Sequence, residues 1–210
     1  MNPDTSALSA AFLQVEATTL LSLEERADVQ FLIRWLESLR VVDDGHFIRV
    51  MVLTLTLCER LSMTSTPAAR RIVMCAGLLH DVGKALISAD ILNKQGPLSN
   101  DERRVIERHP ALGMRLLATL PALEPEVIQA TLHHHEAYNG DGYPYGLAGL
   151  QIPRLARVLS VADVYDALTS TRPYRVAWTH TEAIQYLNRY TGTLFDPLPV
   201  WALNLIKSGR

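Results

Sequence analysis

The sequence predicts an all-α fold, a bundle of helices around one hydrophobic core. Apolar residues recur at helical spacing over most of the chain, and no alternating stretch is long enough to indicate a strand. Capping boxes and Pro or Gly breaks divide the chain into helices. With 210 residues and 48% hydrophobic residues, the chain is long enough to bury one core.

The first predicted helix begins at Ser22, which forms a capping box with Glu25. Apolar residues then recur on one helical face, namely Ala27, Phe31, Leu32, Trp35, Leu36 and Leu39. This periodicity leaves two arrangements open, packing on the core or a seam between two copies in a homodimer. Because residues 1 to about 21 carry few signals of order, we expect an N-terminal arm and helix over 1–40 and a main domain over 41–210.

Caps, breakers and apolar periodicity predict the remaining helices. Thr66-Pro67 begins one of them, and Ser99 with Glu102 forms another capping box. The predicted helical ranges are 46–63, 67–81, 99–109, 113–120, 125–135, 154–169, 181–190 and 201–206. We expect Trp201, in the last range, to be a core or packing residue.

Composition and charge argue against several classes of protein. A formal net charge of −2 disfavours binding to nucleic-acid polymers or anionic membranes, because those partners favour a basic surface. No apolar run approaches the length of a membrane span, and the first residues do not resemble a signal peptide. We therefore expect a cytoplasmic protein, with Cys58 and Cys75 reduced and buried.

Two segments contain residues that suit chemistry. His80 and Asp81 adjoin each other in an apolar helical pattern, where such side chains are costly to bury unless they bind something. Residues 133–144 place three consecutive histidines before a Gly-rich stretch that closes with Pro144. Neutral imidazole nitrogens suit a borderline metal ion. The pattern indicates a cluster of ligands at a helix end, followed by a loop that can lie over a site.

Further short motifs, spread over roughly residues 40 to 200, share their order with a known family. They are His80-Asp81 with Gly83-Lys84, Lys94 with Gly96-Pro97, His109-Pro110 with Gly113, His134-His135-Glu136 with Gly140 and Gly142-Tyr143-Pro144, and the string from Asp163 and Asp166 to Arg172-Pro173-Tyr174-Arg175. In these motifs the chain resembles the HD-GYP family of cyclic-dinucleotide phosphodiesterases. The resemblance implies an HD-domain helical bundle with a Gly-Tyr-Pro loop over a metal site.

The resemblance also implies two divalent transition-metal ions. It assigns seven metal ligands, which are His46, His80, Asp81, His109, His134, His135 and Asp163. Asp81 would bridge both ions through its two oxygens. His46, His80 and Asp163 would be the other ligands of one ion, and His109, His134 and His135 would be the other ligands of the second. A nitrogen and oxygen set without sulfur suits iron, manganese, nickel or zinc, and we expect iron or manganese. Many family members carry a Glu for a third ion where this chain has Val42, so we expect two ions.

Catalytic and substrate roles follow from the same resemblance. Asp81 and Lys84 are the expected catalytic residues, and Lys84 would protonate the leaving oxygen or bind a phosphate oxygen. The expected substrate-binding residues are Lys84, Tyr143, Pro144, Arg172 and Arg175. The guanidinium groups of the two arginines suit phosphate oxygens.

Three neighbouring residues are open to other interpretations. We expect His133 to face solvent or to lie behind the ligands. We expect Asp166 to hydrogen-bond to a neighbouring helix instead of binding a metal. Glu136 has two interpretations of equal weight, one in which it orients a ligand histidine and one in which it caps the loop.

The implied function is metal-dependent hydrolysis of the bacterial second messenger cyclic di-GMP by a metal-bridging hydroxide, to linear pGpG with GMP as a further product left open. One alternative is a catalytically weak module that binds cyclic dinucleotides or partner proteins, which the missing Glu at Val42 favours. Another is a hydrolase of a different cyclic dinucleotide or nucleotide. The resemblance further implies diguanylate cyclases with GGDEF domains as partners.

Overall fold

The computed structural model describes residues 21–39, 45–171 and 176–207, and within these ranges it is helical, with no strand. The α-helices and 3₁₀-helices are α3 (Leu23–Ser38), α4 (His46–Arg60), α5 (Pro67–Leu79), η1 (Val82–Leu86), α6 (Ala89–Leu92), α7 (Asn100–Ile106), α8 (His109–Leu117), α9 (Pro125–His133), η2 (Gly149–Gln151), α10 (Arg154–Thr169), α11 (His180–Arg189) and α12 (Pro197–Lys207). The predicted all-α fold is confirmed.

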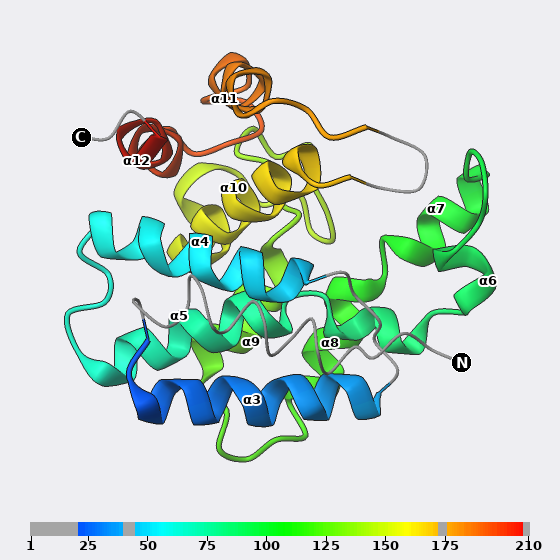
Figure 1. The fold of residues 1–210 in the computed structure, drawn as a ribbon. Coiled ribbons are helices and arrows are strands. Elements are labelled where there is room, and N and C mark those ends of the chain that lie inside the picture. Colours follow the sequence, from blue (N-terminus) through cyan, green and yellow to red (C-terminus); the bar gives the residue numbers. More distant parts are fainter. Residues whose placement is uncertain (1–20, 40–44, 172–175, 208–210) are drawn as a thin grey trace.

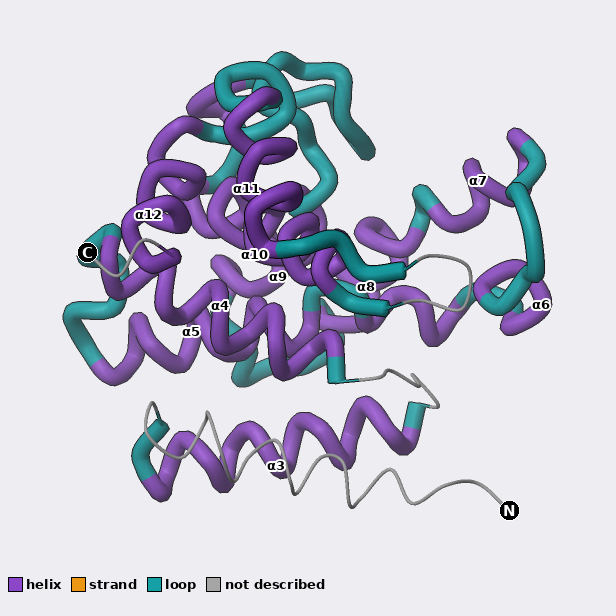
Figure 2. The backbone as a smooth tube through the Cα atoms, turned by 45° about the horizontal axis from the view of Figure 1, so that its top comes forward, coloured by secondary structure: helices purple, strands orange, loops and turns teal. Residues whose placement is uncertain are grey.

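The helices are stacked around α4, α5 and α9. Figure 1 shows α3 on one side of this group and α10, α11 and α12 on the other. Figure 2 shows the same order after the turn, with α6 and α7 projecting from one end. Fully buried side chains of α4 and α5 form the centre of the core, including Met51, Leu55, Leu57, Leu78 and Leu79. Burial of each such side chain contributes roughly 1.5–3 kcal/mol.

Local capping explains where the predicted helices begin. The Ser22 hydroxyl accepts from the Glu25 backbone N–H at 3.2 Å, and the Glu25 carboxylate accepts from the Ser22 N–H at 2.8 Å. The same reciprocal pair forms between Ser99 and Glu102 at α7. These bonds satisfy N–H groups that the first turn of a helix leaves without partners, so the capping boxes predicted from the sequence are confirmed.

The segment around residue 107 differs from the prediction. A helix was expected from Ser99 to His109, but α7 ends at Ile106 and α8 begins at His109. Helix α8 ends at Leu117, before the predicted end at residue 120. Two short elements, η1 and α6, were not predicted because five and four residues are too few to show a helical period.

Two large side chains are more exposed than predicted. Phe31 was placed on the apolar face of its helix but is 69% exposed, and Trp201 in α12 is 54% exposed. In α3, Val29 and Leu36 are buried in the core, and Leu32, Ile33 and Trp35 pack against it while partly exposed. Periodicity predicts an apolar face, but the elements that pack against that face decide how much of it is covered.

Other expectations about the chain have mixed outcomes. Cys58 and Cys75 are free thiols in the buried core, as predicted. None of the helices described is long and apolar enough to span a bilayer. The boundary between an arm and a main domain at residue 40 stays a prediction.

Candidate metal centre

Helices α4, α5, α8, α9 and α10 bring the seven predicted ligands to one place. His46 begins α4, His80 and Asp81 follow α5, His109 begins α8, His134 and His135 follow α9, and Asp163 lies within α10. Their ligand atoms fall into two groups, each with all atoms within 4.8 Å of one another. We call Asp81, His109, His134 and His135 the four-residue group, and His46, His80 and Asp163 the three-residue group.

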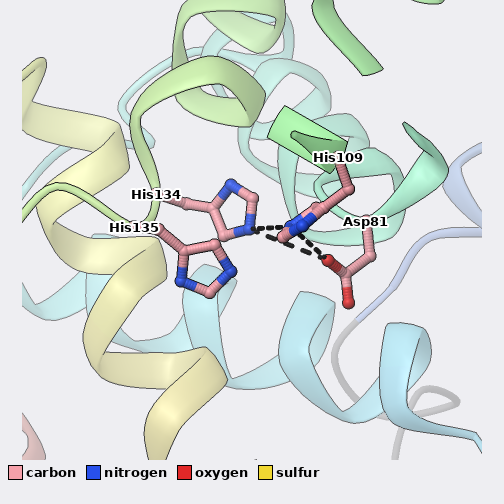
Figure 3. A group of neighbouring side chains, drawn as sticks. All are labelled: Asp81, His109, His134 and His135. Atoms are coloured by element: carbon pink, nitrogen blue, oxygen red, sulfur yellow. Dashed lines mark hydrogen bonds and ion pairs between the residues drawn. The ribbon is translucent and has the colours of Figure 1, made fainter. Parts of the chain in front are cut away.

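The four-residue group is compact and almost wholly buried. Figure 3 shows its three imidazole rings and the Asp81 carboxylate gathered around one point. The Nε2 atom of His109 lies 3.0 Å from Asp81 Oδ1 and 3.3 Å from His134 Nε2. The His134 Nε2 atom lies 3.7 Å from the same Asp81 oxygen.

Backbone carbonyls orient three of the histidine rings. In each case the Nδ1 N–H donates to the carbonyl three residues earlier, in His80 to Gly77 (2.8 Å), His109 to Ile106 (2.8 Å) and His134 to Thr131 (2.7 Å). Pro110 explains one pair, because its nitrogen cannot donate to the Ile106 carbonyl as a helix would require. This pattern fixes the tautomer and leaves Nε2 facing the cluster.

The three-residue group adjoins the other oxygen of Asp81. His46 Nε2 lies 3.2 Å from Asp163 Oδ1 and 3.8 Å from Asp81 Oδ2. His80 Nε2 lies 3.4 Å from Asp81 Oδ2 and 3.9 Å from Asp163 Oδ1. Asp81 therefore faces one group with each oxygen, which is the arrangement a bridging carboxylate needs.

The residues present fit a pair of divalent ions. His80 Nε2 and Asp81 Oδ1 are buried and lack a hydrogen-bond partner. A buried polar atom in this state costs about 1–3 kcal/mol, and a bound ion would remove that cost. Imidazole nitrogens and carboxylate oxygens without a thiolate suit first-row transition metals.

Burial keeps two of the ligand histidines neutral. It lowers the pKa of His134 to about 4. Burial, followed by the nearby His134, also holds the pKa of His135 well below its usual range. Both rings therefore present a free nitrogen lone pair at neutral pH, the form that binds metal.

The carboxylates and His46 behave differently. Burial alone would raise the pKa of Asp81, but the Lys84 ammonium and His80 hold that pKa well below its usual range. Burial would lower the pKa of His46, but hydrogen bonds to Asp163 and Asp166 outweigh it and raise the pKa to about 10, so His46 would release a proton on binding a metal. Both carboxylates of the cluster are thus ionised, as ligands must be.

A buried carboxylate holds the loop that follows the histidines. Glu136 accepts from the backbone N–H of Tyr145 at 2.9 Å and of Leu147 at 3.0 Å. Of its two interpretations, the structure therefore supports loop capping. His133 lies 3.4 Å from the same carboxylate and is buried, so of its two expected positions the one that faces solvent is wrong, and its contact with Glu136 agrees with the other.

The Gly-Tyr-Pro segment folds back onto the cluster. A Cβ on Gly142 would lie 2.1 Å from the Ala137 nitrogen, so only glycine fits there. The Tyr143 N–H donates to the His135 carbonyl at 3.1 Å, and the two rings stack with centroids 4.9 Å apart. Pro144 follows through a cis peptide bond.

Of the predicted catalytic and substrate residues, Lys84 also reaches the cluster. Its ammonium group pairs with Asp81 Oδ2, and its backbone N–H donates to the Asp81 carbonyl at 2.9 Å in the turn of η1. Arg172, Arg175 and Val42 lie outside the described residues. Their expected roles therefore stay predictions.

Asp166 and Arg49 lie directly behind His46. Asp166 accepts from His46 Nδ1 at 2.7 Å and from Arg49 Nε at 2.7 Å, so it hydrogen-bonds to a neighbouring helix as expected. Sequence reasoning missed Arg49. A signal was present in its spacing, because it follows His46 by three residues as Asp166 follows Asp163.

Comparison with known proteins identifies relatives. The sequence profile of the family described as HD domain matches residues 23–198. The cyclic di-GMP phosphodiesterase PA4108 of Pseudomonas aeruginosa is 41% identical over 177 residues, which cover 79% of this chain and 42% of that protein. The cyclic di-GMP phosphodiesterase response regulator RpfG of Xanthomonas campestris pv. campestris is 47% identical over 137 residues, or 63% of this chain and 35% of that protein.

Solved structures share the fold. The crystal structure of a cyclic GMP-AMP-specific phosphodiesterase from Vibrio cholerae matches with a TM-score of 0.66 at 19% identity, over 86% of this chain and 48% of that one. The chain thus spans less than half the length of these relatives, 42% and 35% of the two curated proteins.

Proposed function

Since the chain belongs to the HD-GYP branch of the HD domain family, we propose that it is a metal-dependent phosphodiesterase that hydrolyses cyclic di-GMP to linear pGpG; further cleavage to GMP is left open. The observation that carries this proposal is the position of Asp81, whose two oxygens face separate groups of ligands. Curated relatives named for cyclic di-GMP support the choice of substrate.

The seven ligand residues would hold two divalent ions, of which we propose iron or manganese. When bound, such ions lower the pKa of a shared water and offset the charge that develops on a phosphate. The protein itself orients the ligand side chains and shields them from bulk water. His80, His109 and His134 are oriented by their own backbones, and each is almost wholly buried.

Lys84 is proposed as the general acid. Hydrolysis forms a bond from water oxygen to phosphorus and breaks the bond from phosphorus to the sugar oxygen, which must gain a proton. The Lys84 side chain pairs with Asp81 and is 35% exposed, so its ammonium group can meet both the cluster and a bound substrate. It would donate that proton or hold a phosphate oxygen.

The remaining substrate contacts are proposed from the motifs. Tyr143 and Pro144 would shape the side of the site that receives a base, since the Tyr143 ring already stacks on His135. Arg172 and Arg175 would bind phosphate oxygens through their forked guanidinium groups.

The proposal is tested by purifying the protein without oxygen and measuring its metals by mass spectrometry. The loaded protein is then incubated with cyclic di-GMP, and products are followed by chromatography. We expect about two ions per chain and linear product that disappears on chelation. Binding of cyclic di-GMP without turnover under iron or manganese would contradict the proposal and favour a binding module. Faster turnover of cyclic GMP-AMP than of cyclic di-GMP in the same assay would show that cyclic GMP-AMP is the preferred substrate.

Three further expectations stay predictions. They are a diguanylate cyclase with a GGDEF domain as partner, a homodimer, and a cytoplasmic location. Light scattering of the purified chain tests the homodimer, and pull-down with a purified GGDEF domain tests the partner.

A further inference from the structure

We propose that Asp166 is a positioning residue that sets the His46 ring for metal binding, and that Arg49 anchors Asp166. This inference rests on the proposed function in one respect, the role of His46 as a metal ligand. It concerns the three-residue group and leaves the four-residue group unaffected.

His46 is an exception among the histidines of the cluster. His80, His109 and His134 each donate from Nδ1 to a carbonyl three residues earlier. His46 is the first residue of α4, and its ring contacts a side chain of another helix. Its Nδ1 lies 2.7 Å from Asp166 Oδ2 instead, which is a contact from α10.

Asp163 and Asp166 contact the two nitrogens of the same ring. Asp163 Oδ1 lies 3.2 Å from His46 Nε2, and Asp166 Oδ2 lies 2.7 Å from Nδ1. The two aspartates are three residues apart on α10 and so share one face of that helix. The ring can rotate little without breaking one of these contacts.

Arg49 holds the Asp166 carboxylate, which in turn holds the His46 ring. Its Nε donates to Asp166 Oδ1 at 2.7 Å and its Nη2 donates to Oδ2 at 3.1 Å. This forked pair restrains the plane of the carboxylate. The Asp166 side chain is only 7% exposed, so water competes little for these bonds.

The consequence is a metal position whose affinity depends on a residue that is not a ligand. A carboxylate on the Nδ1 N–H fixes the tautomer, and it makes Nε2 a better electron donor than a backbone carbonyl does. Loss of such a partner lowers metal affinity by about 10–100-fold. Among the described residues, the Asp166 carboxylate hydrogen-bonds to His46 and Arg49 and to no member of the four-residue group, so only one of the two ions should be affected.

The test titrates manganese into the metal-free chain and compares it with Asp166→Ala and Asp166→Asn. Bound ions are counted, and electron paramagnetic resonance distinguishes a coupled pair of Mn²⁺ ions from a single ion. We expect Asp166→Ala to keep one ion, to bind the other about 10–100-fold more weakly, and to lose the coupled signal at low manganese. Asp166→Asn, which can still accept a hydrogen bond from His46, should lose less.

Two further variants test whether a loss of metal comes from the position of His46, from a general loss of fold stability, or from the charge of an unpaired Arg49. Asp196→Asn is the matched control, because Asp196 is also buried and paired with an arginine, Arg157, but it caps α12 away from the cluster. It should lower the melting temperature and keep both ions. The double variant Asp166→Ala/Arg49→Met removes the guanidinium that the single change would leave beside the cluster, and it should still bind the second ion weakly.

Wild-type affinity for both ions in Asp166→Ala, or an equal loss of both, would overturn the proposal. If the second ion is selectively lost but no form of the protein hydrolyses cyclic di-GMP, the positioning role stands and the proposed function fails.

Discussion

The four-residue group and the three-residue group place the same kinds of atoms in different ways. In the four-residue group, His109 and His134 each donate to the carbonyl three residues earlier, and neither residue is more than 1% exposed. In the three-residue group, His46 depends on carboxylates from α10 and its side chain is 13% exposed. His80, also in the three-residue group, donates to the Gly77 carbonyl, so His46 is the ring that differs, being held by contacts between helices.

The kind of partner decides what the orientation of a histidine ring depends on. A ring held by a carbonyl three residues away keeps its orientation as long as the local turn persists. A ring held by a side chain of another helix moves when either helix moves. Asp81 contacts both groups, so it joins the rings held by backbone carbonyls to the one ring held by another helix.

The largest expected effect comes from removing the shared carboxylate. Asp81→Ala takes one oxygen from each group, so we expect both ions to bind weakly and hydrolysis to fall by about a thousandfold or more, equivalent to about 4 kcal/mol. Metal content and the rate of product formation measure it. Asp101→Ala is the control, because that side chain is 89% exposed on α7. A variant that kept both ions would show that Asp81 is not shared.

The next effect breaks the four-residue group by steric means. A Cβ on Gly83 would lie 2.0 Å from the His109 carbonyl oxygen and 2.5 Å from the Gly113 nitrogen, so η1 and α8 must separate. We expect Gly83→Ala to lower the free energy of unfolding by about 3 kcal/mol and to lose the ion held by His109. Denaturant unfolding and metal counting measure the two effects.

Gly149→Ala is the matched control for this change. An added Cβ there meets no atom within 4 Å, although the positive φ of 55° carries its own cost. We expect a loss of about 1 kcal/mol and no loss of metal. If Gly83→Ala were as mild as this control, the close approach of η1 to α8 would not matter for the cluster.

A smaller effect tests the shared carboxylate without removing a ligand. Lys84→Met removes the ammonium group beside Asp81, so kcat should fall by about 10²-fold while two ions remain bound. Steady-state kinetics on metal-loaded protein measures it. Lys94→Met is the control, since Lys94 pairs with Glu102 in the α6–α7 projection. Loss of an ion in Lys84→Met would mean that the lysine acts on the metals instead of on the substrate.

The smallest effect concerns the loop over the four-residue group. Tyr143→Ala removes the ring stacked on His135 and should raise KM about tenfold with both ions retained. Tyr143→Phe keeps the stacking and should match the unaltered protein. Equal losses in both variants would show that the hydroxyl group, and not the ring, is what matters.

Much of the fold followed from local signals. Ser22 and Ser99 begin helices through bonds to residues three positions away, so the sequence predicted these starts correctly. The sequence did not predict the break before His109. It also did not predict η1 and α6, because five and four residues are too few to show a helical repeat of apolar positions. The exposure of Phe31 and Trp201 was also missed, since it depends on which neighbour covers each face.

For the candidate site too, some features were predicted from the sequence and others depend on how the helices pack. The order of the motifs predicted the seven ligand residues that the tertiary structure brings together. It did not predict that Gly83 must be glycine because α8 passes against it or that Arg49 anchors Asp166, and it left two interpretations of Glu136 open, of which the contacts with the loop support capping.

By itself, then, the sequence determined the helices, the identity of the chemical groups and the resemblance that joins them, because caps, periodicity and motifs act over a few residues. Only the tertiary structure decided which oxygen of Asp81 faces which group and which ring depends on a carboxylate from another helix. The physical reason is that residues as far apart as His46 and Asp166 meet only after the helices pack, and the geometry of that packing is a property of the whole core.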